Sequence, residues 1–141
     1  MILPDVNVLV HAFRKEAPEH PLCNSWLNAA LQALEPFGIS PLALSAVVRI
    51  TSNTRTLPYP STFEEIFRFT DYLTSQPHCR LVTPGERHWD IFRRLCIETN
   101  TRGPRVTDAW YAALAIEAGA TFVTLDRDLA RFPGVRWEKP S

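Results

Sequence analysis

Cysteine, lysine and long apolar runs are all scarce in this chain of 141 residues. The three cysteines, Cys23, Cys79 and Cys96, lie far apart without a metal-binding spacing, which predicts reduced thiols. No basic segment precedes an apolar run at the N-terminus, and no apolar stretch approaches the ~20 residues that span a bilayer. We therefore expect no signal peptide, no membrane partner and a cytoplasmic location.

The chain also lacks net charge, since it has 15 basic and 15 acidic residues. A globally basic surface that would attract nucleic acid or a membrane is therefore absent. Only Lys15 and Lys139 are lysines, so nearly all of the positive charge is arginine, the side chain best suited to bidentate contact with phosphate. The composition permits a nucleic-acid partner without requiring one.

Short apolar runs alternate with helical patterns along the chain. Apolar residues at helical spacing, prolines at helix starts and one capping box predict the helices, and brief apolar or β-branched runs predict the strands. The expected helices are Val6–Arg14, Pro21–Leu34, Pro41–Thr51, Phe63–Thr74 and Glu86–Glu98, and the expected strands are Met1–Leu3, Arg80–Thr83, Thr121–Leu125 and Val135–Trp137. The segment Phe37–Ser40 is expected to be a short strand or a turn. This alternation is typical of an α/β fold around a mostly parallel sheet, in a single domain covering residues 1–141.

The most informative stretch covers residues 106–128. Every residue over 109–116 is apolar or aromatic, which predicts a helix buried on all sides. Asp108 is expected to open this helix. The β-branched and aromatic segment 121–125 predicts a short buried strand, and Asp126 follows it directly.

A third acid, Asp5, interrupts the apolar N-terminal segment. Strand ends and helix starts meet where an α/β sheet builds its ligand crevice, so we expect Asp5, Asp108 and Asp126 to lie close together, with Asp128 beside the last. Buried carboxylates need a partner, and a divalent cation such as Mg²⁺ is the simplest one. Taken singly, Asp108 is also explained as a helix cap and Asp126 as the start of a turn; the trio favours a metal site.

Three segments carry a resemblance to a known family: Leu3–Leu9, Thr107–Ala109 and Thr124–Asp128. In order and spacing they resemble the acidic motifs of PIN-domain ribonucleases, and most of all those of the VapC toxins of bacterial toxin–antitoxin pairs. The similarity extends along nearly the whole chain. It implies a PIN-like three-layer α/β/α sandwich, a Mg²⁺- or Mn²⁺-dependent endoribonuclease that cleaves RNA, a homodimer, and inhibition by a VapB-type antitoxin.

The resemblance also implies roles for individual residues. Asp5 and Asp108 would be the principal metal ligands. Asp126, with Asp128, would complete the acidic site. The supporting polar groups would be Asn7 and Thr107.

One departure from the family pattern concerns the third helix. Many members of the family carry a glutamate at about the place occupied here by Ser45 and Ala46. No acidic residue lies between Glu35 and Glu64. The contact is therefore missing, or water or Ser45 replaces it, and the second metal position stays open.

Carboxylates that hold a metal also repel the RNA backbone, so positive groups must line the approach. The candidates by location are Arg49, Arg55, Arg102 and Arg105. The loop over residues 100–105 adjoins the acidic site and contains a Gly-Pro break.

Two other functions remain open from the sequence. The first is a phosphotransferase of the haloacid dehalogenase type that uses Asp126 and Asp128, although that motif normally follows the first strand. The second is a catalytically degenerate PIN-like module that binds RNA or a protein without cleaving RNA, as the missing glutamate would suggest.

Overall fold

The computed structural model describes all of residues 1–141 as an alternation of short strands and helices. In chain order these elements are β1 (Ile2–Pro4), α1 (Val6–Phe13), α2 (His20–Gln32), β2 (Phe37–Ile39), α3 (Pro41–Thr51), α4 (Phe63–Thr74), β3 (Cys79–Leu81), α5 (His88–Thr99), the 3-10 helix η1 (Gly103–Arg105), α6 (Val106–Ala118), β4 (Thr121–Val123), the 3-10 helix η2 (Arg127–Arg131) and β5 (Arg136–Glu138).

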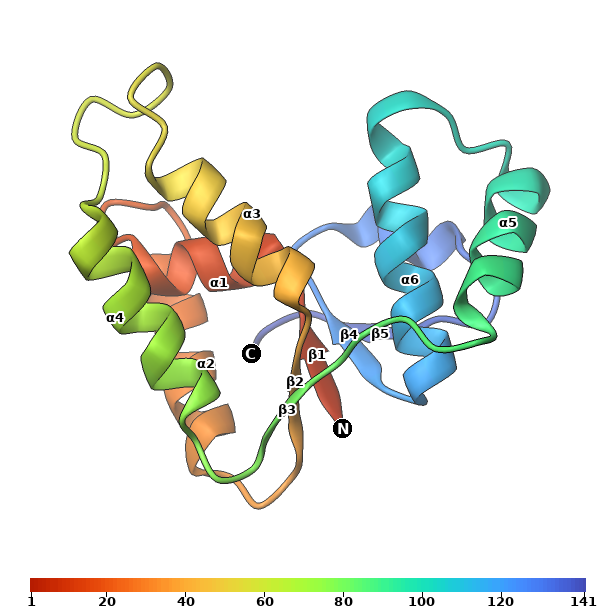
Figure 1. Ribbon diagram of the computed structural model, residues 1–141, viewed down its shortest axis with the longest axis horizontal. Coiled ribbons are helices and arrows are strands. Elements are labelled where there is room, and N and C mark those ends of the chain that lie inside the picture. Colours follow the sequence, from red (N-terminus) through yellow and green to blue (C-terminus); the bar gives the residue numbers. More distant parts are fainter.

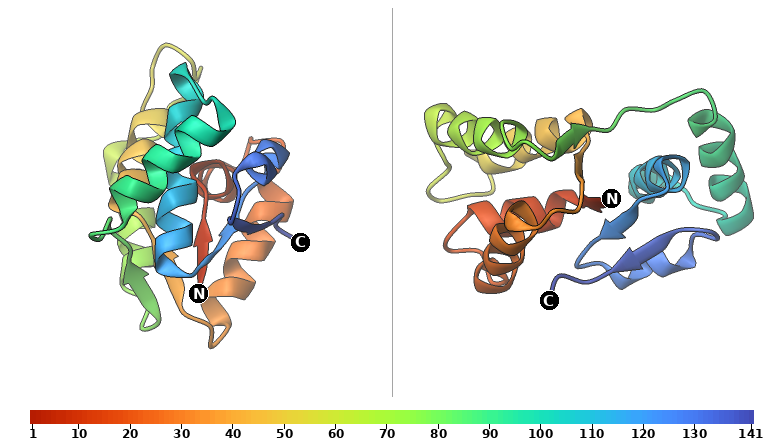
Figure 2. Two further views of the ribbon diagram at one scale, coloured as in Figure 1. Left: turned by 90° about the vertical axis from the view of Figure 1, so that its right-hand side faces the viewer. Right: turned by 90° about the horizontal axis from the view of Figure 1, so that it is seen from below.

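The five strands form one sheet in the order β3-β2-β1-β4-β5, and every pair is parallel. The chain runs outward from β1 to β3 and then returns past β1 to β4 and β5. Helices α1 to α4 therefore cover one face of the sheet, while α5, α6 and η2 cover the other (Figures 1 and 2). The α/β/α sandwich is confirmed, and the sheet is wholly parallel.

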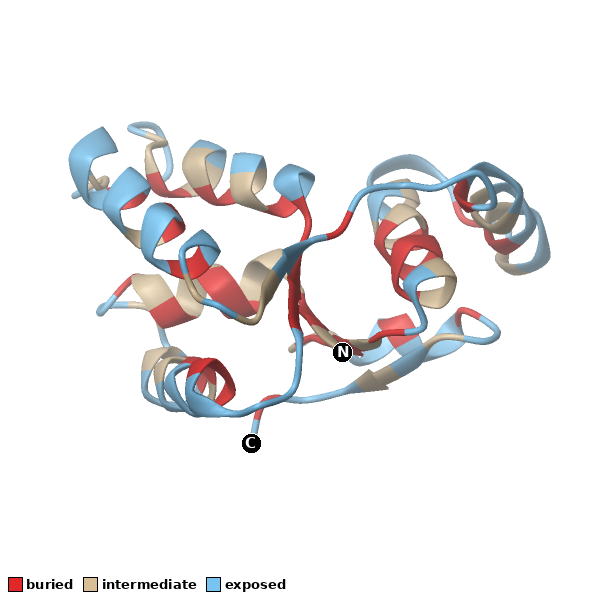
Figure 3. Cartoon of the chain, turned by 60° about the horizontal axis from the view of Figure 1, so that its bottom comes forward, coloured by how far each residue is buried: buried red, intermediate tan, exposed pale blue.

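The hydrophobic core fills the space on both sides of this sheet (Figure 3). Helix α6 contributes more buried residues than any other helix, namely Ala109 and all of Tyr111–Ala115. The predicted burial of the apolar run is confirmed for these six residues, while Trp110 and Ile116 are partly exposed. No helix combines the length and the apolarity needed to cross a membrane.

Local signals in the sequence set several helix ends. The Ser40 side chain caps α3 by accepting a hydrogen bond from the Leu42 amide. Thr62 and Glu65 form both hydrogen bonds of the expected capping box at the start of α4. Gly119 ends α6 in the left-handed conformation, with φ of 65°, so the chain turns at once into β4.

Two boundaries next to the acidic residues differ from expectation. Because η1 leads directly into α6, Asp108 lies within the first turn of the helix instead of opening it. Arg105 holds the cap position, so helix capping does not explain Asp108. Strand β4 ends at Val123, earlier than the expected Leu125, which leaves Thr124 in the connection to η2.

Candidate active site

The site lies where the sheet topology reverses direction. Strand β1 has β2 on one side and β4 on the other; the chain builds the sheet from β1 to the β3 edge and then crosses back to β4 and the β5 edge. Such a switch point opens a crevice at the carboxyl ends of the strands, which is where ligands of α/β proteins bind. Asp5 directly follows β1 at this point, and its amide donates to the carbonyl of Val123 at the end of β4 (2.8 Å).

Asp5 is held by residues from both strand ends. Its Oδ1 accepts from the Val6 amide (2.7 Å), and its Oδ2 accepts from the Thr124 hydroxyl (2.7 Å). Asn7 completes the arrangement: its Nδ2 donates to Thr124 Oγ1 (3.3 Å), and its Oδ1 accepts from the Leu125 amide (3.2 Å). These contacts fix the orientation of the Asp5 carboxylate before any ligand arrives.

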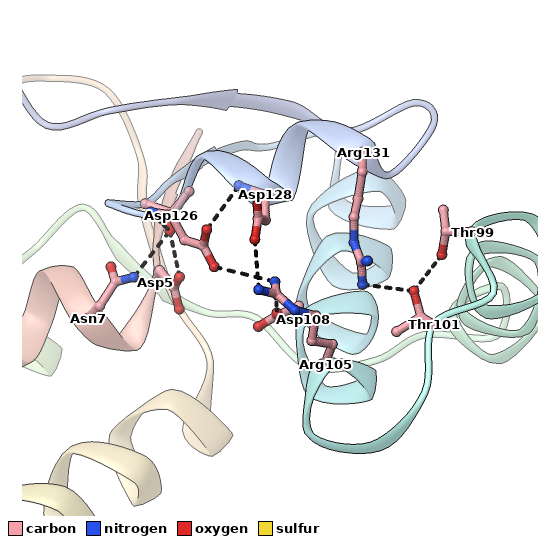
Figure 4. A network of polar contacts seen from close by, with 10 residues as sticks. Asp5, Asn7, Thr99, Thr101, Arg105, Asp108, Asp126, Asp128 and Arg131 are labelled. Atoms are coloured by element: carbon pink, nitrogen blue, oxygen red, sulfur yellow. Dashed lines mark hydrogen bonds and ion pairs between the residues drawn. The ribbon is translucent and has the colours of Figure 1, made fainter.

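Three further acids surround one arginine. Arg105 Nη1 lies 3.8 Å from Asp108 Oδ2 and 4.0 Å from Asp126 Oδ2, while its Nη2 lies 2.7 Å from Asp128 Oδ2 (Figure 4). Asp126 also accepts from the Asp128 amide (2.9 Å), so it begins a turn as well as facing the site. The guanidinium thus serves as the internal counter-ion of these carboxylates.

Burial and mutual repulsion alter the acidity of the two innermost carboxyls. Burial raises the pKa of Asp5 to about 6; the hydrogen bonds from Thr124 and Val6 oppose this rise, and the charges of Asp108 and Asp126 add to it. Burial also raises the pKa of Asp108, and the charge of Asp126 adds to this rise, while Arg105 opposes it. Both carboxylates therefore gain from a nearby positive charge.

Asp5 and Asp108 line the same pocket, which has a volume of about 360 Å³. No three acidic, histidine or cysteine side chains lie close enough together to hold a metal ion by themselves. Mg²⁺, however, usually binds through one or two carboxylates, several waters and substrate phosphate. Two desolvated carboxylates beside an open pocket fit that requirement.

Of the other candidate site residues, some line the pocket and some lie outside it. Thr107 and Arg49 line the pocket together with Asp5 and Asp108. Arg55 is exposed in the loop after α3, outside the pocket. Arg102 is also outside it, with its Nε donating to the Asn100 side chain (3.1 Å).

Three further residues near the site have roles that only the structure reveals. Thr124 is fully buried yet polar, next to the acidic loop, and this combination was the available signal. Tyr111 lines the pocket and lies one turn after Asp108, so helical periodicity places it on the same side of α6. Arg131 lowers the pKa of Asp108 and donates to Thr101 (3.0 Å; Figure 4), and no local pattern in the sequence points to this role.

Comparison with known proteins identifies the family of this chain. The sequence model of the PIN domain matches residues 2–135. Ribonuclease VapC25 and Ribonuclease VapC31 of Mycobacterium tuberculosis are each 38% identical over 140 residues, covering 99% of this chain and 99% of the relative. The chain therefore belongs to the PIN domain family. Its full-length relatives within that family carry the name VapC ribonuclease.

Solved structures share the fold. VapBC2 from Rickettsia felis, bound to a DNA fragment from its promoter, superposes with a TM-score of 0.75 at 18% identity, covering all of both chains. VapC20 of M. tuberculosis, described as a toxin that cleaves the sarcin-ricin loop, gives a TM-score of 0.68 at 15% identity over 96% of this chain and 99% of that one. The chain belongs to the PIN family, and Asp126 follows β4 and not the first strand. The alternative of a phosphotransferase of the haloacid dehalogenase type is therefore wrong.

Proposed function

We propose that this protein is a Mg²⁺- or Mn²⁺-dependent endoribonuclease of the VapC type, which hydrolyses phosphodiester bonds in RNA. The observation that carries the proposal is the pair of desolvated carboxylates, Asp5 and Asp108, which face one pocket at the switch point of the sheet. The full-length VapC relatives support the same activity.

The residues around the pocket have distinct roles in this proposal. Asp5 and Asp108 hold the cation, with Asp126 and Asp128 adding negative charge nearby. Thr124 and Asn7 keep the Asp5 carboxylate in place, and Thr107 adds a hydroxyl to the pocket wall. When bound, the cation supplies an acidified water for attack on phosphorus and neutralises charge on the departing oxygen.

Positive side chains have a separate role in this proposal. RNA brings a negatively charged backbone toward an acidic site, and neutralising that backbone supplies most of its affinity. Arg49 lies in the pocket wall, where a phosphate approaching Asp5 and Asp108 meets it, and Arg105 offsets the negative charge of the neighbouring acids.

A single substitution tests the proposal. Asp108→Asn keeps the size of the side chain and one acceptor but removes a charge needed to hold the cation. We expect the variant to melt at the same temperature as the wild type or higher, because repulsion with Asp126 is relieved, and to lose RNA cleavage in added Mg²⁺. A folded variant with full activity would refute the proposal. A wild type that binds RNA without cleaving it would instead support the degenerate binding module.

We extend the proposal to two partners and a location. VapBC complexes among the structural neighbours support a small VapB-type antitoxin, which co-expression and copurification would test. Large apolar side chains exposed on α4, including Phe63 and Phe67, support a homodimer, which light scattering would test. The three free thiols and an RNA substrate suit the cytoplasm.

A further inference from the structure

The pocket at the switch point has two chemically different walls. One wall carries the carboxylates of Asp5 and Asp108. The other is formed by α3, whose only charged side chain is Arg49, and Tyr111 from α6 lies at the border between the two walls. Ser45 and Arg49 are four residues apart on α3, so they share one face of that helix, and both line the pocket.

This second wall lacks what a second cation requires. No residue of α3 is acidic, and the carboxylates available across the pocket are those that already serve the first cation. A guanidinium at this position repels a cation and attracts an anion. The wall therefore suits a phosphate group better than a metal.

The hydrogen-bond donors of this wall are free. Arg49 takes part in none of the ion pairs of the chain, whereas Arg105 contacts three carboxylates. Tyr111 is only 5% exposed, and no hydrogen bond within the chain contributes to the pKa of its hydroxyl. Because no buried side-chain oxygen lacks a partner, this hydroxyl is not fully buried, and Tyr111 lines the pocket.

The hydroxyl of Tyr111 also stays protonated under working conditions. Burial raises its pKa to about 12, and the charge of Asp5 adds to the rise, while Arg49 opposes it. At neutral pH the phenol is therefore a donor. Its sensitivity to both Asp5 and Arg49 agrees with a position between the two walls of the pocket.

We infer that Arg49, Tyr111 and Ser45 form a subsite for a phosphate of the RNA backbone, in the place where a second metal ion would need an acid. This inference rests on the proposed function and deepens it by assigning the α3 wall to the substrate. Arg49 would donate to two phosphate oxygens through its planar fork, and Tyr111 and Ser45 would each donate one hydrogen bond.

RNA binding without metal tests the subsite separately from catalysis. The probe is a fluorescein-labelled 20-nucleotide RNA of random sequence, and its anisotropy is measured in EDTA, where cleavage stops. Arg49→Met should weaken binding about 10- to 100-fold, the effect of losing charged hydrogen bonds, and should lower the salt dependence by about one phosphate contact. Tyr111→Phe, which keeps the buried ring, should weaken binding about 5-fold.

Controls make each outcome decisive. Arg55→Met removes an exposed arginine outside the pocket and should have a clearly smaller effect than Arg49→Met. Arg49→Lys keeps the charge without the fork and should fall between Arg49→Met and the wild type. Equal losses in Arg49→Met and Arg55→Met, or unchanged binding in both Arg49→Met and Tyr111→Phe, would overturn the subsite. So would two tight Mn²⁺ sites in the RNA-free wild type, measured by titration calorimetry.

The same data separate this inference from the proposed function. If the wild type cleaves RNA but the pocket variants bind RNA normally, the subsite fails and the ribonuclease proposal stands. If the wild type binds RNA through Arg49 and Tyr111 but never cleaves it in Mg²⁺ or Mn²⁺, the subsite stands and the ribonuclease proposal fails.

Discussion

Asp5 lets the energetic cost of the acidic site be measured as a change in fold stability. Its pKa rises from 3.8 to about 6 on folding, chiefly because the carboxylate is buried. Each pH unit corresponds to about 1.4 kcal/mol, so the ionised carboxylate costs the folded metal-free protein ~3 kcal/mol. This cost is absent below pH ~4, grows as the pH rises toward 6, and is complete above pH ~7.

The substitution Asp5→Asn removes this cost but also removes one hydrogen bond of the side chain. The amide oxygen of asparagine still accepts from the Thr124 hydroxyl, but its NH₂ group cannot also accept from the Val6 amide. Losing that one hydrogen bond costs about 1 kcal/mol. In EDTA at pH 7.5 we therefore expect the variant to be ~2 kcal/mol more stable than the wild type.

Urea denaturation between pH 4.5 and pH 7.5 measures this effect. The advantage of the variant should shrink by ~2 kcal/mol at the acidic end, because Asp5 of the wild type is then protonated in the folded state. Asp71→Asn, an exposed carboxyl without an ion pair on α4, is the matched control and should show no comparable dependence on pH. A stability difference between Asp5→Asn and the wild type that stays constant with pH would refute the reasoning.

Three further substitutions test other parts of the site. Arg105→Met should strengthen Mn²⁺ binding to the RNA-free protein about 2- to 10-fold, because it removes the guanidinium that competes with the cation for the carboxylates. The control Arg102→Met should leave Mn²⁺ binding unchanged. Weaker Mn²⁺ binding in Arg105→Met would contradict the role of Arg105 as a competing counter-ion. Ser45→Glu should add a carboxylate to the α3 wall and strengthen Mn²⁺ binding, and calorimetry that finds two tight sites already in the wild type would show that another residue fills the gap. Thr124→Val should lower Mn²⁺ affinity and the cleavage rate by about 10- to 100-fold, since the hydroxyl orients Asp5; unchanged affinity in a folded variant would show that the hydroxyl is dispensable.

Local sequence signals predicted the fold well because most elements carry their own start or stop. The proline after Ser40 and the capping box at Thr62 place α3 and α4, and the uniformly apolar run of α6 requires burial. Parallel pairing then brings the ends of β1 and β4 to one edge of the sheet. The neighbourhood of Asp5 and Asp108 therefore follows from these local features together with the parallel pairing of the strands and the packing of α6.

The contacts within the site could not be predicted in this way. In the sequence, a threonine at the end of a strand is ordinary, because threonine is common in strands. Only the pairing of β1 with β4 brings the Thr124 hydroxyl to Asp5. Likewise, the sequence offers four candidate arginines without ranking them. Arg49 lines the pocket because of the way α3 packs, whereas Arg55 lies outside it. The turn at η1 places Arg105 beside the carboxylates.

The hydrogen bond between Thr124 and Asp5 joins residues that are 119 positions apart. The central strand β1 likewise finds its β4 partner only near the other end of the chain. A ribosome synthesising this protein therefore exposes Asp5 early but cannot complete its surroundings until Thr124 has emerged. The order of translation thus delays assembly of the acidic site until every element from α1 to β4 has been synthesised.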